Sequence, residues 1–412
     1  MTGSWEDENL TNFNKEGFDK FLRWCFENDV SDILIETGEV LAVKKFGEVT
    51  DVGSKILRYD EITGILGEIY QPASASLLKS GEELNFKYLV CKEDDSVIRF
   101  RVNATSCQGS EGSDDGIEIV VRPIPGTVPD CDDLDIEEEI RKACSAQYGI
   151  ILITGPTGSG KSTTIAALLK MIGVKYRRHI VTFESPIEFD LKSIPNRKSR
   201  IVQSEVPINL GSFSAATVNS LRRAPDIIFF GEARDAEVIS ACIREAQTGH
   251  LVLSTVHTNS VAMTPSRMVD EFDPAERKGA TSKLVDALRL IVHQRLYPKM
   301  GGGRIAIREF LIFTEEMRRK LLFALLTKDD LGSEIEKLVK ENGKPLLSDA
   351  KKKFREGCID LSTYITIVNE VGDKDKDLKI VPEVAKKLLQ KSLINKITYD
   401  TWISDMRILE EA

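Results

Sequence analysis

The feature that most limits how this chain can fold is a glycine-rich loop at residues 155–162, with the sequence Gly-Pro-Thr-Gly-Ser-Gly-Lys-Ser. It follows an apolar run at residues 150–153 and precedes a helix-forming stretch. The pattern G-x-x-x-x-G-K-[S/T] in that setting is a phosphate-binding loop, whose backbone N–H groups surround nucleotide phosphates. The sequence therefore predicts an α/β fold with Mg-ATP bound where a strand is followed by a helix.

Each part of the loop has an expected task. Lys161 should reach the β- and γ-phosphates, and the Ser162 hydroxyl should hold Mg²⁺. We expect ATP to contact the whole loop and the residue after it, namely Gly155, Pro156, Thr157, Gly158, Ser159, Gly160, Lys161, Ser162 and Thr163. The alternative is an ordinary glycine turn, which the flanking strand and helix patterns disfavour.

Four short apolar runs predict the strands of the sheet, at residues 150–153, 180–183, 227–230 and 251–253. Each run is continuous, which is typical of strands buried on both faces. Helix-forming stretches separate the runs, so the sheet should be largely parallel. The runs are followed by the Gly155 loop, Glu184, Glu232 and His257. Because parallel sheets bind ligands at the carboxyl ends of their strands, we expect these groups to form one site.

The polar residues at these strand ends have candidate roles, each with a structural alternative. The pattern leaves open whether Glu184 polarises the attacking water or is, like Glu188, an acid of a surface loop. Glu232 can bind Mg²⁺ or its water shell, or else form a salt bridge at the strand end. We expect His257 to sense the γ-phosphate and His250 to be structural. No Cys, His or Asp cluster accompanies either histidine, so neither resembles a metal ligand.

Composition excludes several other classes of protein. With 412 residues the chain should hold two or three domains. A net charge of -9 argues against direct DNA binding. Seven cysteines without a C-x-x-C pair argue against a zinc site or a disulfide framework. The N-terminus lacks the features of a signal peptide, and no apolar run approaches the roughly 18 residues of a membrane span. We therefore expect a cytoplasmic protein without an integral membrane segment.

Changes in pattern divide the chain into four segments. They are a mixed α+β module at 1–122, a proline-rich linker at 123–134, the parallel-sheet domain at 135–319 and a helical region at 320–412. The first module contains strand-like stretches at residues 32–35, 41–43, 99–102 and 117–121.

Two helical features are also predicted. A helix should follow the linker, because apolar or cysteine side chains recur at a spacing of four, at Ile136, Ile140, Cys144 and Tyr148. In the last segment, residues 350–366 repeat the pattern of residues 385–401, which indicates a duplicated helical hairpin.

Taken together, these motifs resemble the secretion ATPases of type II and type IV systems. The nearest branches are the twitching-motility retraction ATPases and the type IVB (Dot/Icm and related conjugative) secretion ATPases. The resemblance is carried by Ser31-Asp32-Ile33, residues 99–104, GPTGSGKST at 155–163, FESPIEF at 183–189, APDIIFFGEARD at 224–235 and TGHLVLSTVHTNS at 248–260. It implies an N-terminal PAS-like domain, a RecA-like ATPase domain and a homohexameric ring. It also implies peripheral recruitment to inner-membrane secretion or pilus platform proteins at the cytoplasmic face.

The resemblance assigns roles to single residues as well. Glu184 corresponds to the Asp-box glutamate that acts on water, Glu232 to the Walker B glutamate and His257 to the His-box histidine. Arginines of such proteins reach toward the nucleotide of a neighbouring subunit. Here the candidates for that role are Arg234 and Arg222, with Arg101 and Arg122 as weaker ones.

The sequence departs from the family pattern at some positions. Ser185 stands where the family has Asp, and so does Ala224. The Ala-Ile-Arg-Asn-Leu-Ile signature of retraction ATPases is absent after Phe313, which favours the secretion or conjugation branch. Pilus retraction and DNA translocation by a RecA-like motor remain as alternatives. A regulator that binds ATP without hydrolysing it is disfavoured by the presence of Glu184 and Glu232.

Overall fold

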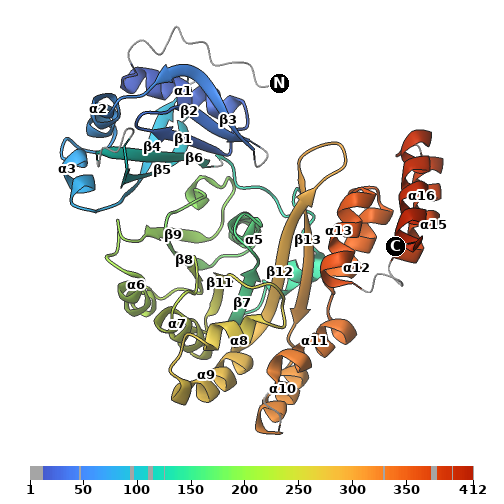
Figure 1. Cartoon of the computed structure of the whole chain (residues 1–412). Coiled ribbons are helices and arrows are strands. Elements are labelled where there is room, and N and C mark those ends of the chain that lie inside the picture. Colours follow the sequence, from blue (N-terminus) through green and yellow to red (C-terminus); the bar gives the residue numbers. More distant parts are fainter. Residues whose placement is uncertain are drawn as a thin grey trace. The chain divides into compact units, whose positions relative to one another are not determined.

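The chain forms two compact units, Met1–Thr127 and Val128–Ala412 (Figure 1). The computed structural model describes residues 13–411 except 46–47, 93–96, 110–114, 125, 328–329, 373–377 and 392. The break between the units falls inside the proline-rich segment at 123–134. The N-terminal residues used to judge the presence of a signal peptide lie outside the described part of the chain.

The first unit is built on a six-stranded sheet with the order β3-β2-β1-β6-β5-β4. Every neighbouring pair in this sheet is antiparallel. The elements in chain order are α1 (Lys15–Glu27), β1 (Asp32–Glu36), β2 (Val40–Lys45), β3 (Glu48–Ile56), α2 (Tyr59–Ile69), α3 (Ser74–Lys79), β4 (Leu84–Cys91), β5 (Val97–Cys107) and β6 (Gly116–Ile124). The four strand-like stretches predicted in this module are confirmed as parts of β1, β2, β5 and β6.

One face of this sheet is covered by helices. Alternate strand residues such as Ile33, Ile35 and Phe100 are fully buried, in one core with α1, α2 and α3. Their neighbours along each strand point to the other face, as the period of two requires. Helix α1 contributes Phe18 and Phe21 to the core, both without exposed surface. The unit is therefore a two-layer α+β module, with helices packed on one face of its sheet.

The second unit is built on a seven-stranded sheet with the order β13-β12-β7-β11-β10-β8-β9. Its strands are β7 (Gly149–Thr154), β8 (His179–Glu184), β9 (Arg200–Glu205), β10 (Ile227–Phe230), β11 (Leu251–Val256), β12 (Leu288–Pro298) and β13 (Arg304–Ile312). All pairs are parallel except β12 with β13. The four predicted strands and the parallel sheet are confirmed, and β9, β12 and β13 extend the sheet at its two edges.

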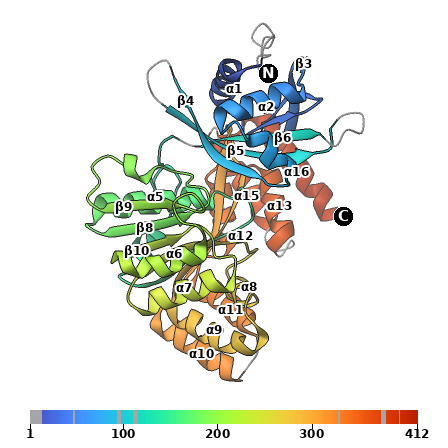
Figure 2. The same ribbon diagram turned by 90° about the vertical axis from the view of Figure 1, so that its left-hand side faces the viewer.

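Helices cover both faces of this sheet, which explains the continuous apolar runs. On β7, Ile150 and Leu152 pack in the core that includes α7 (Ala236–Gln247) and α9 (Pro274–Ala287). The alternate residues Ile151 and Ile153 pack in a second core with α5 (Lys161–Lys175) and α4 (Glu138–Ala143). Figure 2 shows α7 and α9 on one side of β8 and β10. The shorter elements are η3 (Leu191–Ser193), α6 (Phe213–Ser220), η4 (Leu221–Arg223) and α8 (Thr264–Val269).

The C-terminal region is helical and contains the predicted duplication. Its elements are α10 (Glu315–Thr327), α11 (Leu331–Asn342), α12 (Leu346–Arg355), α13 (Leu361–Val371), η5 (Leu378–Ile380), α15 (Val381–Gln390) and α16 (Lys396–Glu411). Helix α15 begins 35 residues after α12, and α16 begins 35 residues after α13. Both hairpins share a core with Ile305 and Ile307 of β13, so the tail packs on the edge of the parallel sheet (Figure 1).

The helix predicted from the spacing of four residues is wrong in its length. Helix α4 covers only Glu138–Ala143. Glu137, the N-cap, has an extended backbone with φ -61° and ψ 142°, which leaves Ile136 outside the helix. Gly149, with φ 113°, starts the next strand. Tyr148 is 51% exposed and lies under the guanidinium of Arg289 instead of continuing an apolar stripe.

Candidate active site

The phosphate-binding loop joins β7 to α5, as predicted, and only glycine fits at its first position. Gly155 has φ 144°, and a Cβ there would lie 2.2 Å from the carbonyl oxygen of Gln294. Gly160, with φ 81°, is the N-cap of α5. The first N–H groups of a helix have no partner within it and attract anions. The loop is thus shaped to present backbone donors to a phosphate group.

Lys161 is folded back over the loop. Its Nζ donates to the carbonyl oxygens of Gly155 at 2.8 Å and Pro156 at 2.9 Å. Burial lowers the pKa of the Lys161 ammonium, and the negative charges of Glu232 and Glu188 partly offset this effect. An ammonium held among carbonyl oxygens and nearby carboxylates is poised to exchange those contacts for phosphate oxygens.

Glu232 forms the centre of a charged group next to Lys161. Its Oε2 accepts from Arg234 Nε at 2.7 Å, and its Oε1 lies 3.4 Å from His257 Nε2. Burial and the positive charge of Lys161 lower the pKa of His257, so its imidazole is neutral near pH 7. The ends of β10 and β11 therefore bring three predicted site residues together beside the loop.

Glu184 ends β8, the strand next to β10. It is 8% exposed. Its Oε1 accepts hydrogen bonds from Thr182 Oγ1 at 2.6 Å and Gln203 Nε2 at 3.0 Å. These bonds orient the carboxylate against β8 and β9. Glu188, four residues later, is exposed and acts electrostatically on Lys161. The structure therefore places two glutamates of the FESPIEF segment in different surroundings.

The remaining histidine and arginine candidates lie in separate places. His250 precedes β11, where its Nδ1 lies 3.0 Å from the Glu245 carbonyl oxygen, a local contact that fits a structural role. Arg222 is exposed on η4. Arg101 and Arg122 belong to the first unit, where they are cross-strand neighbours on β5 and β6. Arg122 also forms an ion pair with Asp32.

The residues at the loop fit a nucleotide with Mg²⁺. Ser159 Oγ is buried and has no hydrogen-bond partner among the described residues, so its hydroxyl is available to donate to a ligand bound in the loop. The part of the chain that the structure describes contains no cluster of three or more His, Cys, Asp or Glu that could hold a metal alone. Mg²⁺ bound with a nucleotide needs only one or two protein oxygens, because phosphates and water supply the others. Ser162 and Glu232 are the side chains that could provide them.

Sequence reasoning missed the residues on β12 beneath the loop. His293 is 1% exposed, with Nδ1 at 3.4 Å from Thr154 Oγ1, and burial lowers its pKa to about 4. Gln294, next along the strand, contacts the loop itself. The apolar residues 290–292 could have indicated a strand here, but nothing in the sequence links that strand to residue 155.

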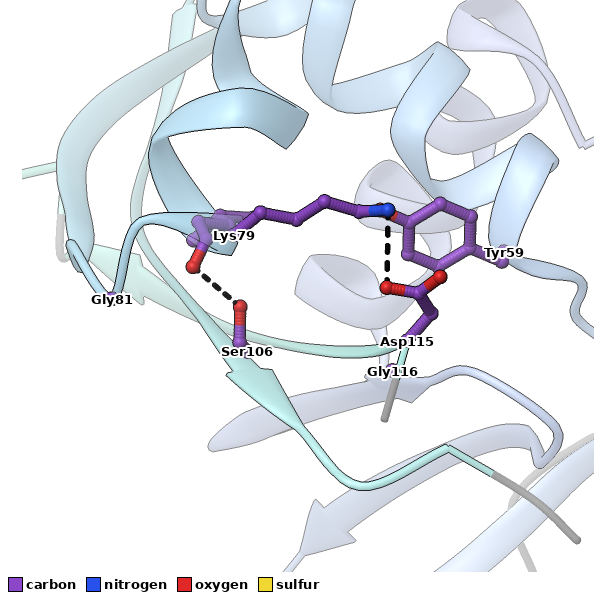
Figure 3. A pocket seen from close by; sticks show the side chains of 7 residues that line it. Tyr59, Lys79, Gly81, Ser106, Asp115 and Gly116 are labelled. Carbon is purple, nitrogen blue, oxygen red and sulfur yellow. Dashed lines mark hydrogen bonds and ion pairs between the residues drawn. The ribbon is translucent and has the colours of Figure 1, made fainter. Parts of the chain in front are cut away.

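A separate cavity of about 340 Å³ lies in the first unit (Figure 3). It is lined by Tyr59, Leu78, Lys79, Gly81, Ser106, Asp115 and Gly116. Lys79 Nζ lies 3.0 Å from Asp115 Oδ1 and 5.4 Å from the centre of the Tyr59 ring. None of the predicted site residues lines this cavity, and the Lys79 ammonium within it is already paired with Asp115.

Comparison with known proteins identifies the family. Residues 94–302 match the type II/IV secretion system protein family. The chain is 34% identical over 299 residues to the type IV pilus retraction ATPase PilT of Pseudomonas aeruginosa, covering 73% of this chain and 83% of that protein. This chain belongs to the type II/IV secretion system protein family. As a member of this family of secretion and pilus ATPases it is an ATP hydrolase.

Solved structures of this family share the fold. The X-ray structure of the Legionella pneumophila ATPase DotB has 36% identity and a TM-score of 0.78, covering 88% of this chain and 97% of that chain. The crystal structure of the pilus retraction motor PilT with bound ADP has 29% identity and a TM-score of 0.71. It covers 84% of this chain and 96% of that one. In the PilT structure this fold therefore holds a nucleotide.

None of the helices within the described residues is both long and apolar enough to span a membrane.

Proposed function

We propose that this chain is a hexameric motor that hydrolyses ATP at the loop 155–163 to energise a type IV secretion or pilus machine. The observation that carries the proposal is the meeting of the loop with Lys161, Glu232 and His257 at the carboxyl edge of one parallel sheet. Both halves of a hydrolytic site, phosphate binding and water activation, are available there.

Different residues of the chain would bind the phosphates, polarise the water and contact the γ-phosphate. The loop N–H groups and Lys161 bind and orient the phosphates. Glu184 polarises the attacking water, a role supported by its place at the tip of β8 and by the bonds that orient its carboxylate. Neutral His257 can donate a hydrogen bond toward the γ-phosphate and accept one at its other nitrogen.

Mg²⁺ is the metal proposed for this site. Ser162 would hold it directly, and Glu232 would hold it or its water. When bound, Mg²⁺ neutralises charge that develops on the phosphate oxygens. Arg234 pairs with the Glu232 carboxylate, and the Lys161 ammonium acts on it electrostatically from the loop.

The ring is proposed because the site of a single chain leaves arginines at its surface. Arg222 is exposed, and the Arg234 side chain is 74% exposed although it pairs with Glu232. We propose that one or both serve the nucleotide of a neighbouring subunit, with Arg101 and Arg122 as further candidates. The first unit, taken as a PAS-like domain at 1–122, and the helical region at 320–412 would complete each subunit.

The machine is proposed to be a type IVB or conjugative secretion system, at the cytoplasmic face of the inner membrane. Support comes from the similarity to DotB over 97% of that chain. Pilus retraction is the second candidate, favoured by the relative PilT and by the similarity to the type IV pilus ATPase PilU.

Recovery of the complex from native membranes discriminates between these machines. A tagged Glu232→Gln variant, which should stay loaded with ATP, is the bait, and Lys161→Ala is the matched control without nucleotide. We expect the bait to recover secretion-platform proteins more strongly than the control. Recovery of pilus-platform proteins instead would select the second candidate, and equal recovery by both variants would count against an ATP-dependent machine.

A further inference from the structure

Gln294 on β12 is wedged under the phosphate-binding loop. It is 1% exposed, and every polar atom of its amide is used. Nε2 donates to the carbonyl oxygen of Ser159 at 2.5 Å. Oε1 accepts from Thr164 Oγ1 on α5 at 2.9 Å and from Arg308 Nε on β13 at 2.8 Å. One buried amide therefore joins the loop, the helix that follows it and the edge of the sheet.

Holding the Ser159 carbonyl oxygen also fixes the next N–H group. In a trans peptide the C=O and N–H bonds point in opposite directions. With its oxygen turned toward Gln294, the Ser159–Gly160 peptide turns the Gly160 N–H the other way. A Cβ on Gly160 would lie 3.0 Å from Gln294 Nε2, so the two residues are in close contact. We propose that Gln294 is a positioning residue that aims the Gly160 N–H at the nucleotide phosphates.

This inference rests on the proposed role of the loop in binding ATP, and it extends beyond the loop through Arg308. The Arg308 side chain is 1% exposed. Besides Gln294, its guanidinium donates to the carbonyl oxygens of Asp135 and Leu134, each at 2.9 Å, and lies 3.4 Å from Glu137 Oε2. Arg308 thus joins the segment before α4 to Gln294, and through Gln294 to the phosphate-binding loop.

The same network continues into the C-terminal helices. The backbone N–H of Arg308 donates to Asp349 Oδ2 on α12 at 2.9 Å. Lys344 Nζ lies 2.6 Å from Asp349 Oδ1 and 2.8 Å from Glu137 Oε1. Burial would raise the pKa of Glu137, but Arg308 and Lys344 outweigh it and keep that pKa below its usual value.

Two cations therefore face two carboxylates: Arg308 and Asp349 are fully buried, and Lys344 and Glu137 are partly buried. Such a group is rigid, because breaking it at one member leaves another charge buried and unpaired. The rigid group ties helix α12 to the amide of Gln294, and so to the loop. A change in the position of α12 is expected to change nucleotide affinity.

Mg-ADP affinity, measured by calorimetry together with KM and kcat for ATP, tests the role of Gln294. Gln294→Glu keeps oxygens for Thr164 and Arg308 but removes the donor to Ser159. Gln294→Met removes all three bonds, and the Glu variant is decisive if the Met variant does not fold. We expect Gln294→Glu to raise Kd and KM by about three- to tenfold, as for one lost hydrogen bond, with a smaller change in kcat.

Glu370→Gln is the matched control. Glu370 on α13 also joins the tail to β12, through Arg295 and Tyr297, but these lie on the opposite face of the strand from Gln294. The Glu370→Gln variant should leave the Kd for Mg-ADP unchanged. An unchanged Kd in Gln294→Glu, or an equal rise in Glu370→Gln, would overturn the positioning role. If the wild type and Lys161→Ala bound Mg-ADP equally, the proposed function of the loop would itself be wrong.

Asp349→Asn tests the link to the tail. The amide removes the negative charge from Lys344 while keeping an oxygen for the Arg308 N–H. We expect Kd to rise about twofold to threefold, as for one weakened polar contact, and the effects of Asp349→Asn and Gln294→Glu to be non-additive. Strictly additive effects, or no effect of Asp349→Asn, would show that α12 does not act on the loop.

Discussion

Glu232 is the residue at which the charges of the site meet, since Arg234 and His257 both contact its carboxylate. We predict that Glu232→Gln still binds Mg-ATP but loses turnover by about a hundredfold or more, as for loss of a positioned catalytic carboxylate. The amide keeps the size of the side chain and loses the charge that acts on Mg²⁺ and its water. Binding of a fluorescent ATP analogue and phosphate release measure the two effects separately. Loss of binding together with turnover would mean that Glu232 has a different role.

Glu184 and Glu188 provide a matched pair within one segment. Glu184 is buried and oriented by Thr182 and Gln203, whereas Glu188 is exposed. We predict that Glu184→Gln binds ATP without hydrolysing it, because the water loses its base. Glu188→Gln, measured in the same phosphate-release assay, should retain turnover. The opposite result would transfer the water-activating role to Glu188.

The central elements of the fold could be predicted from sequence because their signals are local. A strand buried on both faces is continuously apolar, so β7, β8, β10 and β11 were visible in the sequence. The strands toward the edges of the sheet mix polar and apolar residues in their sequences. Strand β9 contains Arg200 and Glu205, and β12 and β13 contain buried polar residues. The network of Gln294 and Arg308 could not be predicted, because the partners that link it to the loop, to α5 and to the segment before α4 lie 130 to 174 positions away along the chain and share no motif.

The duplicated hairpins differ in how closely they are joined to the ATPase sheet. The first carries Asp349, which reaches Arg308, whereas the second packs on the first through contacts such as Trp402 against Phe354, with ring centres 5.6 Å apart. We predict that truncation after Gly372 leaves ATP turnover and ring formation largely intact and weakens recovery with the membrane machine. Turnover assays and size-exclusion chromatography test this. An insoluble or ring-deficient product would show that the second hairpin is structural.

At the level of the whole molecule, a ring with composite sites requires that each subunit act on the nucleotide of its neighbour. Arginines that act on a neighbour's nucleotide contribute about a thousandfold or more in related phosphoryl transfer. We therefore predict that Arg234→Ala subunits, mixed with wild type, lower ATP turnover more than in proportion to their fraction. Because Arg234 also pairs with Glu232 of its own chain, Arg222→Ala is the companion variant. Activity that falls in strict proportion for both variants would indicate independent sites.

Hydrolysis of ATP at the phosphate-binding loop is tested most directly by measuring ATP turnover by the purified full chain and by its Lys161→Ala variant. Lys161 supplies the ammonium of the loop, and alanine leaves the glycine-rich backbone in place. We predict Mg²⁺-dependent phosphate release by the wild type and a loss of turnover to below about a tenth of that value in the variant, the minimum expected when one strong charge-assisted contact is removed. Turnover above that level in Lys161→Ala would contradict the claim that ATP is hydrolysed at this loop.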